Sequence, residues 1–432
     1  MEYLSEILAA LLSFVIFKYS ILSYNVSYYL GLQDTRNTYI ERNNNNVAYF
    51  LCSDGRGHYT QFIQLARLMK SDGVNVALVY INGNSNITAP DYFYKYCLDS
   101  GIQVHTFYGP TLNSVVSNGK VDYFRLLLSA VSIVPRSILD VTRIYNKLNE
   151  AKINTVINLL SSECSLFNAC LNFDANIVCV GTQYKKMLRY ENRYSVESSC
   201  GLVAKFLGLV GLNFIISLTT AKANLVVCLS PLKHLQLESY RSPNLHVTPV
   251  RCNLDIVPQQ TVKKTVCVYL VYQDYISDIE RLADVMQDYT FDVFTRLSGE
   301  VKSLRSNVHI HNINKDLFAD KLAKCAIYMC TAGIESVCEA LVLEKPIILV
   351  PTQGHYEQYE NMLLFCSNLS MVQQVSSFKL TLELQRAMKI LELQMLDEEE
   401  SAIYKIQCGR ASRYYKDKAE TKAFLDLTLF RS

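Results

Sequence analysis

The sequence lacks an excess of charge of either sign, because its 432 residues carry 42 basic and 40 acidic side chains. Nucleic-acid-binding proteins usually present a basic surface, so this near balance argues against nucleic acid as a partner. The sequence also has no Cys-x-x-Cys pair among its 14 cysteines. Neither a zinc site nor a disulfide framework is therefore indicated, and buried free thiols in a reducing, cytoplasmic compartment are the simpler interpretation.

A good secretory signal is missing as well. The chain begins with Glu2 and Glu6 instead of a basic cluster, and no small-x-small cleavage site clearly follows the apolar start. Residues 7–32 are nevertheless apolar and rich in Tyr, with Lys18 as their only charge. We expect residues 1–42 to be a hydrophobic segment that associates with a membrane; a span, a helix in the interface and a helix packed on the protein itself stay open.

The rest of the chain is too long for one compact core, and two domains of roughly 200 residues are expected. Short apolar runs alternate with helical stretches, which predicts an α/β protein with parallel sheets covered by helices on both faces. We place the first domain at residues 47–250 and the second at residues 264–395. Pro243, Pro249 and Pro258 predict a loop-like region at the end of the first domain, with the linker near residues 250–264. Residues 396–432 are predicted to form C-terminal helices.

A glycine turn follows the first predicted strand, residues 47–52. Gly55 and Gly57 let the backbone approach a ligand, and His58 would lie at the start of the next helix, above the carboxyl edge of the sheet. His58 is a candidate general base, because its unperturbed pKa lies nearest neutrality; a histidine that only fills the helix start is the alternative. A dinucleotide-binding fingerprint fits less well, since Thr60 stands where the third glycine would fall.

Gln183 follows another predicted strand, residues 177–181, and should face the same edge of the sheet. A basic run comes next, with Lys185 as its first member. These cations could meet an acidic or phosphorylated acceptor, or they could simply be solvated.

A second strand, turn and helix lie in the middle of the second domain. Residues 327–330 are a short apolar run, and the small residues Thr331, Ala332 and Gly333 allow a sharp turn after it. A helix should follow and end before Lys345-Pro346. The free N–H groups and positive dipole end of this helix would point out of the carboxyl edge of the sheet, where a phosphate can bind.

Polar residues around this turn suit a nucleotide sugar. Ser336 adds a hydroxyl donor, and the carboxylate of Glu339 could accept hydrogen bonds from the hydroxyls of a ribose. Glu357 and Gln358, after the next strand, could do the same for a sugar ring. Glu335 would oppose a pyrophosphate if it pointed inward, so we expect it to face outward. An ordinary βαβ unit with solvated charges is the alternative interpretation.

In order and spacing these residues resemble the donor-binding signature of the GT-B glycosyltransferases, especially the glycosyltransferase family 28 type and its relatives. The resemblance rests on the Gly-x-Gly-His loop of the first domain and on six groups in the second, namely Ala332-Gly333, Glu339-Ala340, Lys345-Pro346, Pro351, Glu357-Gln358 and Asn361. It implies two facing Rossmann-like domains with a cleft between them, and C-terminal helices that return to the first domain. Cys338 and Met362 depart from the family pattern, in which Ser and a small residue are usual.

The resemblance also assigns roles to residues. The turn of Thr331, Ala332, Gly333 and Ser336 would bind the pyrophosphate, Glu339 the ribose, and Glu357 and Gln358 the transferred sugar. The main chain at Ile313 would read uracil, Gly57 would lie near the donor, and Gly55 and Gln183 would lie on the acceptor side.

The activity that the resemblance implies is transfer of a sugar from a nucleotide sugar, a UDP-sugar, to an acceptor hydroxyl, with a membrane lipid as a candidate acceptor. No cofactor or metal is expected, since the turn and its helix can stabilise the leaving diphosphate and no Asp-x-Asp pair occurs in the chain. Inversion at the anomeric carbon would need a base, and His58 is the candidate. A nucleotide-sugar epimerase of the same fold and a non-catalytic nucleotide-sugar-binding partner on a membrane are the alternatives.

Overall fold

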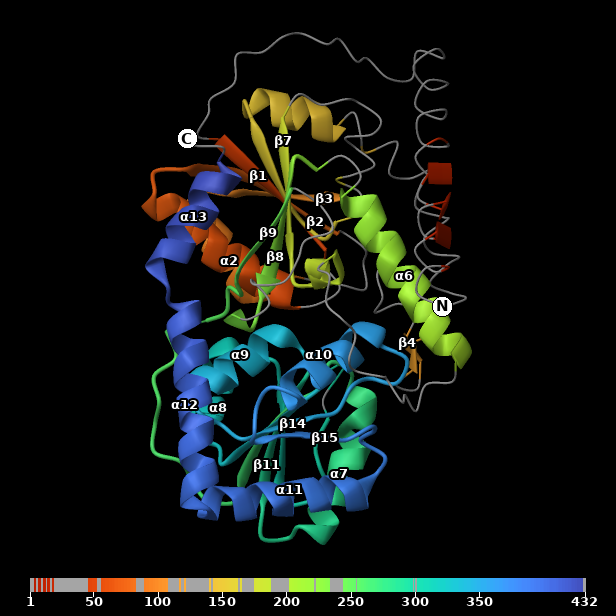
Figure 1. Ribbon diagram of the computed structural model, residues 1–432, viewed down its shortest axis with the longest axis vertical. Coiled ribbons are helices and arrows are strands. Elements are labelled where there is room, and N and C mark those ends of the chain that lie inside the picture. Colours follow the sequence, from red (N-terminus) through yellow and green to blue (C-terminus); the bar gives the residue numbers. More distant parts are fainter. Residues whose placement is uncertain are drawn as a thin grey trace.

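The computed structural model describes residues 46–52, 56–82, 89–107, 116–117, 120–121, 140, 143–161, 164, 175–187, 202–220, 223–233, 244–253, 255–297, 299 and 301–429. Nearer the N-terminus it describes Leu4, Ile7, Leu8, Leu11, Leu12, Phe14, Val15 and Lys18. The described part forms two α/β halves, drawn one above the other in Figure 1.

The first half is built on a seven-stranded parallel sheet with the order β3-β2-β1-β6-β7-β8-β9. Its strands are β1 (Asn46–Leu51), β2 (Asn75–Asn82), β3 (Gln103–Phe107), β6 (Thr155–Leu159), β7 (Asn176–Gly181), β8 (Leu225–Ser230) and β9 (Leu245–Pro249). The other elements of this half are α2 (Arg56–Ser71), α3 (Asp91–Ser100), the 3₁₀ helix η2 (Gln183–Met187), α6 (Leu202–Thr220), and the short antiparallel pair β4 (Val116–Ser117) and β5 (Lys120–Val121).

Side chains of β1 alternate between two cores, which explains why the strand reads as one apolar run. Tyr49 packs with Phe62 of α2 on one face of the sheet, whereas Phe50 stacks on Tyr80 of β2 on the other. A strand that is covered on both faces needs apolar residues at successive positions. The second core also contains Ile216, so α6 covers the face opposite to α2.

The second half is built on a six-stranded parallel sheet with the order β12-β11-β10-β13-β14-β15. Its strands are β10 (Thr265–Tyr269), β11 (Thr290–Thr295), β12 (Val308–Asn312), β13 (Ile327–Cys330), β14 (Ile347–Leu349) and β15 (Val372–Gln374). The helices are η4 (Gln273–Tyr275), α7 (Ile276–Val285), α8 (Lys315–Lys324), α9 (Ile334–Val342), α10 (Tyr356–Cys366), α11 (Thr381–Leu396), α12 (Glu398–Tyr415) and α13 (Lys418–Thr428).

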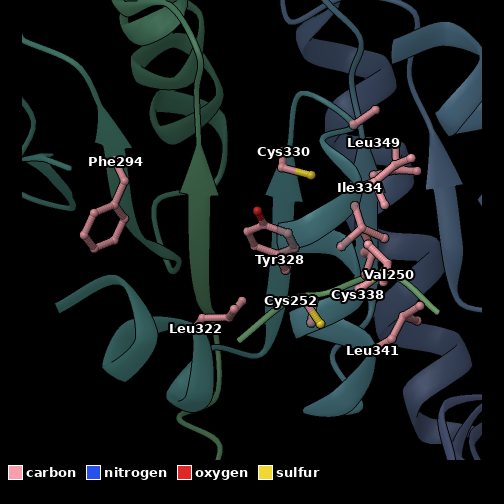
Figure 2. Packing of buried hydrophobic residues seen from close by; sticks show 14 of the residues in the cluster. Val250, Cys252, Phe294, Leu322, Tyr328, Cys330, Ile334, Cys338, Leu341 and Leu349 are labelled. Atoms are coloured by element: carbon pink, nitrogen blue, oxygen red, sulfur yellow. The ribbon is translucent and has the colours of Figure 1, made fainter. Parts of the chain in front are cut away.

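The linker after β9 packs on α9. Figure 2 shows Val250 and Cys252 beside the apolar side chains that α9 turns inward, among them Cys338 and Leu341. All four side chains are almost fully buried, at 2% exposure or less. The linker therefore belongs to the same buried cluster as the inward side chains of α9.

The last two helices carry the chain back to the first half, along the left side of Figure 1. The Tyr404 hydroxyl of α12 donates to the carbonyl of Lys345 at 2.6 Å, and the Tyr415 hydroxyl donates to the carbonyl of Pro231 at 2.8 Å. Arg251 then donates to Thr421 of α13 at 3.0 Å. These contacts join the halves on one side and leave the carboxyl edges of the two sheets facing each other.

One strand departs from the sequence-based expectation. The region around Pro243, Pro249 and Pro258 is punctuated like a loop, but residues 245–249 form β9 at the edge of the first sheet. Proline is tolerated on an edge strand because one side of that strand has no neighbour to receive its N–H groups.

The predicted membrane segment, residues 7–32, lies largely outside the described residues. The described apolar side chains near its start are exposed, for example Ile7 at 55% and Phe14 at 58%. No helix in the described part of the chain is long and apolar enough to cross a bilayer.

Candidate functional site

A cavity of about 460 Å³ lies between the carboxyl edges of the two sheets. This volume falls within the roughly 300–1,000 Å³ of typical small-molecule sites. The first half contributes residues that follow β1 and β7, including Gly57, His58 and Gln183. The second half contributes residues after all of its strands except β15, including Arg296, Ile313, Lys315, Ala332, Gly333, Ser336, Glu339, Glu357, Gln358 and Asn361.

The turn between β13 and α9 forms one wall of this cavity. Ala332 has a left-handed backbone with φ of 58°, and Gly333 is the N-cap of α9 with an extended backbone. The N-cap accepts no hydrogen bond through a side chain, and the Ser336 hydroxyl donates back to the carbonyl of Gly333 at 3.3 Å. The first N–H groups of α9 therefore retain the positive end of the helix dipole next to the cavity, an arrangement that suits an anion.

Thr331 lies behind this wall and not in it. Its side chain is 1% exposed, and its hydroxyl oxygen has no hydrogen-bond partner among the described residues. Ala332, Gly333 and Ser336 line the cavity, so three of the four residues predicted for the turn reach it.

Glu335 points into the cleft, so the prediction that it faces outward is wrong. Gln61 of α2 donates a hydrogen bond to its carboxylate across the domain interface, and a Cβ atom on Gly57 would lie only 2.6 Å from Oε2. Burial raises the pKa of Glu335. The physical reason is the close approach of α2: its glycine leaves a space that the carboxyl group fills, and its glutamine supplies a hydrogen bond.

Glu339 is held one turn further along α9, where it lines the cavity at 8% exposure. Its Oε1 accepts a hydrogen bond from the backbone N–H of Asn253 in the linker, at 3.1 Å. Burial, together with the charge of Glu335, raises the pKa of this carboxyl from 4.5 to about 7, and the hydrogen bond from Asn253 and the charge of Lys315 oppose the rise. The linker thus orients a carboxyl group that is poised to ionise near neutrality.

Glu357 and Gln358 begin α10 on the opposite side of the turn. Gln183 of η2 donates to Oε1 of Glu357 at 2.9 Å, so two of the predicted residues meet across the cleft. Oε1 of Gln358 accepts from the backbone N–H of Thr352 at 2.7 Å, which fixes the side chain and leaves its amide nitrogen as a donor.

His58 lies in the first turn of α2 and lines the cavity. Its Nδ1 is buried without a hydrogen-bond partner among the described residues, and burial lowers its pKa to about 4. The imidazole is therefore neutral at neutral pH, which is the form that can accept a proton. Gly57 lines the cavity beside it, whereas Gly55 lies outside the described residues.

Ile313 lines the cavity after β12, and its N–H donates to Oδ1 of Asn312 at 2.9 Å. Sequence reasoning missed two cations of the same wall, Arg296 and Lys315. Arg296 directly follows β11, so its place after an apolar run was the signal that could have identified it. Lys315 begins α8, and its ammonium lies over the ring of Tyr92 in the first half, 5.8 Å from the ring centroid.

No cluster of three His, Cys, Asp or Glu side chains that could hold a metal ion occurs in the described ranges.

Comparison with known proteins places the chain in a family. Its residues 46–383 match the family model of glycosyl transferase family 1. The chain belongs to this family. By sequence, no curated protein matches it.

Solved structures with a similar fold include a UDP-glucosyltransferase from Polygonum tinctorium, at 13% identity, with 90% of this chain and 99% of the other covered and a TM-score of 0.63. Phytolacca americana UGT2, solved with UDP-2fluoro-glucose and pterostilbene, has 13% identity, 91% and 100% coverage, and a TM-score of 0.59. MurG of Acinetobacter baumannii has 10% identity, 89% and 99% coverage, and a TM-score of 0.50. The protein is a glycosyltransferase, and the predicted architecture of two facing Rossmann-like domains is confirmed.

Protonation of Glu357 should couple stability to pH. Burial raises the pKa of Glu357 from 4.5 to about 7. Because the folded state then holds the proton more tightly than the unfolded state, its stability falls as pH rises from about 4.5 through about 7. We expect Glu357→Gln to gain thermal stability relative to the wild type between about pH 5 and pH 8. Melting curves of both proteins measure this difference. The buried histidines are the same in both proteins, so their contribution to the pH dependence cancels when the two curves are compared.

Glu383→Gln is the matched control, because Glu383 is exposed on α11. Its melting temperature should follow that of the wild type at every pH. If Glu357→Gln also follows the wild type, Glu357 does not hold its proton more tightly in the folded state.

Proposed function

We propose that this glycosyltransferase moves the sugar of a UDP-sugar to the hydroxyl of an acceptor, with inversion and without a metal ion. One observation carries the proposal: three groups line one cavity. They are the start of α9, which suits an anion, the carboxyl group of Glu339, which suits the hydroxyls of a ribose, and the side chains of Glu357 and Gln358, which suit a sugar ring. A nucleotide sugar presents a diphosphate, vicinal hydroxyls and a sugar ring, so each part of it has a chemically suited partner.

Positive groups of the second half support a leaving diphosphate in this cavity. The start of α9 supplies uncapped N–H groups, and Arg296 and Lys315 supply cations on the same wall. Preorganised charges of this kind stabilise a leaving group without rearrangement during the reaction, and one donor is typically worth about 3 kcal/mol. Solved structures of similar fold support UDP as the nucleotide, since one holds UDP-2fluoro-glucose and another holds UDP.

The acceptor is activated from the first half. As its oxygen bonds to the anomeric carbon, the bond from that carbon to the diphosphate breaks and UDP leaves with the electron pair. The hydroxyl proton passes to the neutral imidazole of His58, which lies on the cavity wall opposite to α9. Attack from the face opposite to the leaving group inverts the anomeric centre.

A membrane lipid is the acceptor that we propose. Apolar side chains near the N-terminus are exposed, including Leu4 and Val15 at 61% each, and an exposed apolar helix favours a membrane surface. The 19-residue helix α6 is mostly apolar, with Lys205 as its only charge, and it contacts α10, the helix that contains Glu357 and Gln358. The reaction would then take place beside the membrane, on its cytoplasmic face.

Incubation of the purified protein with radiolabelled nucleotide sugars and membrane lipids tests the proposal. Transfer of label from a UDP-sugar into the lipid fraction is the expected result. An altered sugar formed without an acceptor would identify an epimerase instead, and binding without turnover would identify a non-catalytic partner. Transfer of label only to water-soluble acceptors would contradict the lipid acceptor but would still support the transfer of a sugar.

Glu335 should weaken donor binding through its charge. Its carboxyl group lies in the first turn of α9, where a negative charge repels a diphosphate at the start of the same helix. We expect Glu335→Gln to bind UDP several-fold more tightly than the wild type, with the larger gain at high pH, where more of the wild-type carboxyl groups are ionised. Titration calorimetry at two pH values measures the effect.

Glu344→Gln removes the same charge at the exposed far end of α9 and serves as the control. Its UDP affinity should match that of the wild type. Weaker UDP binding by Glu335→Gln would show that the carboxylate assists the donor site.

A further inference from the structure

A lysine side chain of η2 in the first half contacts the second half at the wall of the cavity. Lys185 Nζ donates a hydrogen bond to Oδ1 of Asn361 on α10, although the two residues lie 176 positions apart. Nδ2 of the same Asn361 donates to the carbonyl of Ala332 at 3.0 Å. One amide group therefore connects a cation of the first half to the turn that precedes α9.

The turn needs such a restraint. Ala332 adopts a left-handed backbone, which a residue with a Cβ atom rarely keeps unless its surroundings fix it. Asn361 is 2% exposed, and its bond to the Ala332 carbonyl holds the peptide group that leads into Gly333. Since the N–H groups at the start of α9 follow this peptide, their direction depends on the position of Asn361.

A second link runs from η2 to Glu357, one helical turn before Asn361. Gln183 donates to this carboxylate at 2.9 Å, and Lys185 stabilises its ionised form. The other charged groups that face Glu357 are Glu335 of α9 and Glu360 of α10, and both act against ionisation. Lys185 is the cation that opposes them and the effect of burial.

Lys185 itself does not reach the cavity. Asn361 and Glu357 line it, whereas Lys185 is not among the lining residues and contacts Asn361. We propose that Lys185 is a positioning residue of the donor site, which acts through Asn361 on the diphosphate turn and through Glu357 on the sugar side. The donor site would then be complete only when the two halves are closed on each other.

The alternative is that Lys185 only stabilises the contact between the two halves. That role involves the same contacts, but it predicts a different result. Its loss would lower stability or weaken ligand binding by one factor at every pH. A positioning role predicts two separable effects: weaker binding of the diphosphate, and a changed pH dependence of sugar binding, because Glu357 loses its stabilising cation.

The inference rests on the proposed UDP-sugar donor, and binding measurements with UDP and a UDP-sugar across a pH series test it. We expect Lys185→Met to weaken binding of both ligands about tenfold and to raise the pH midpoint of UDP-sugar binding by about one unit, with no such shift for UDP. Lys185→Arg should restore both properties. Asn361→Leu should weaken UDP binding to a similar degree but leave the midpoint unchanged, because the charge of Lys185 is still present to stabilise the Glu357 carboxylate.

Lys70→Met is the control, since Lys70 is an exposed lysine at the end of α2. Wild-type affinities in Lys185→Met would overturn the inference, and so would a uniform loss of affinity with an unchanged midpoint. Failure of the wild type itself to bind UDP or any UDP-sugar would contradict the proposed donor, and the inference with it.

Discussion

Replacement of His58 by alanine is expected to lower kcat by a factor of about 10²–10⁴ and to leave the Kd of the donor within about twofold of the wild type. His58 lines the cavity from the first half, and its burial lowers its pKa to about 4. The imidazole is thus unprotonated throughout the neutral range, as a general base must be. Single-turnover transfer measured alongside donor binding separates the two quantities.

His309→Ala provides the comparison, because His309 is exposed on β12, away from the lining residues. Its kcat should equal that of the wild type. If His58→Ala also turns over at the wild-type rate, His58 is not the base. A large rise in Kd with an unchanged kcat would instead place His58 among the donor-binding groups.

Much of the fold could be predicted from the sequence, because buried parallel strands are recognisable as short apolar runs. A strand was expected at residues 47–52 and is found at Asn46–Leu51. A helix was expected after the turn at Gly333 and is found at Ile334–Val342, with Gly333 as its N-cap. These are local features, set by periodicity and by small residues at a turn. The edge strand β9 was missed because its prolines resemble loop signals.

Four of the second-domain residues that line the cavity could also be found, since Ser336, Glu339, Glu357 and Gln358 belong to one continuous stretch of sequence. Arg296 and Lys315 lie outside that stretch and were missed. Contacts between the halves could not be foreseen. Glu335 meets a glutamine that is 274 positions away, and Glu357 meets one that is 174 positions away. Whether Glu335 faces solvent or the cleft depends on how closely α2 approaches α9, and no local pattern encodes that distance.

Replacement of Glu339 by alanine is expected to weaken the binding of UDP and of the UDP-sugar by about ten- to a hundredfold. The carboxyl group lines the cavity, and the N–H of Asn253 holds one of its oxygens in place. Vicinal hydroxyls are good donors to a carboxylate fixed in this way, and the bonds are strongest when the acceptor is ionised. Because the pKa of Glu339 is raised to about 7, the wild-type affinity should also increase as pH rises through neutrality.

Comparison of UDP with its 2′-deoxy analogue decides whether the ribose is what Glu339 binds. The wild type should prefer UDP, and Glu339→Ala should bind the two nucleotides equally, because the group that distinguishes them is gone. Glu339→Gln keeps an oxygen for the Asn253 N–H but loses the charge, so it should retain part of the preference. If Glu339→Ala still prefers UDP, another residue reads the 2′-hydroxyl. The carboxyl group would then serve only to fix the linker against α9.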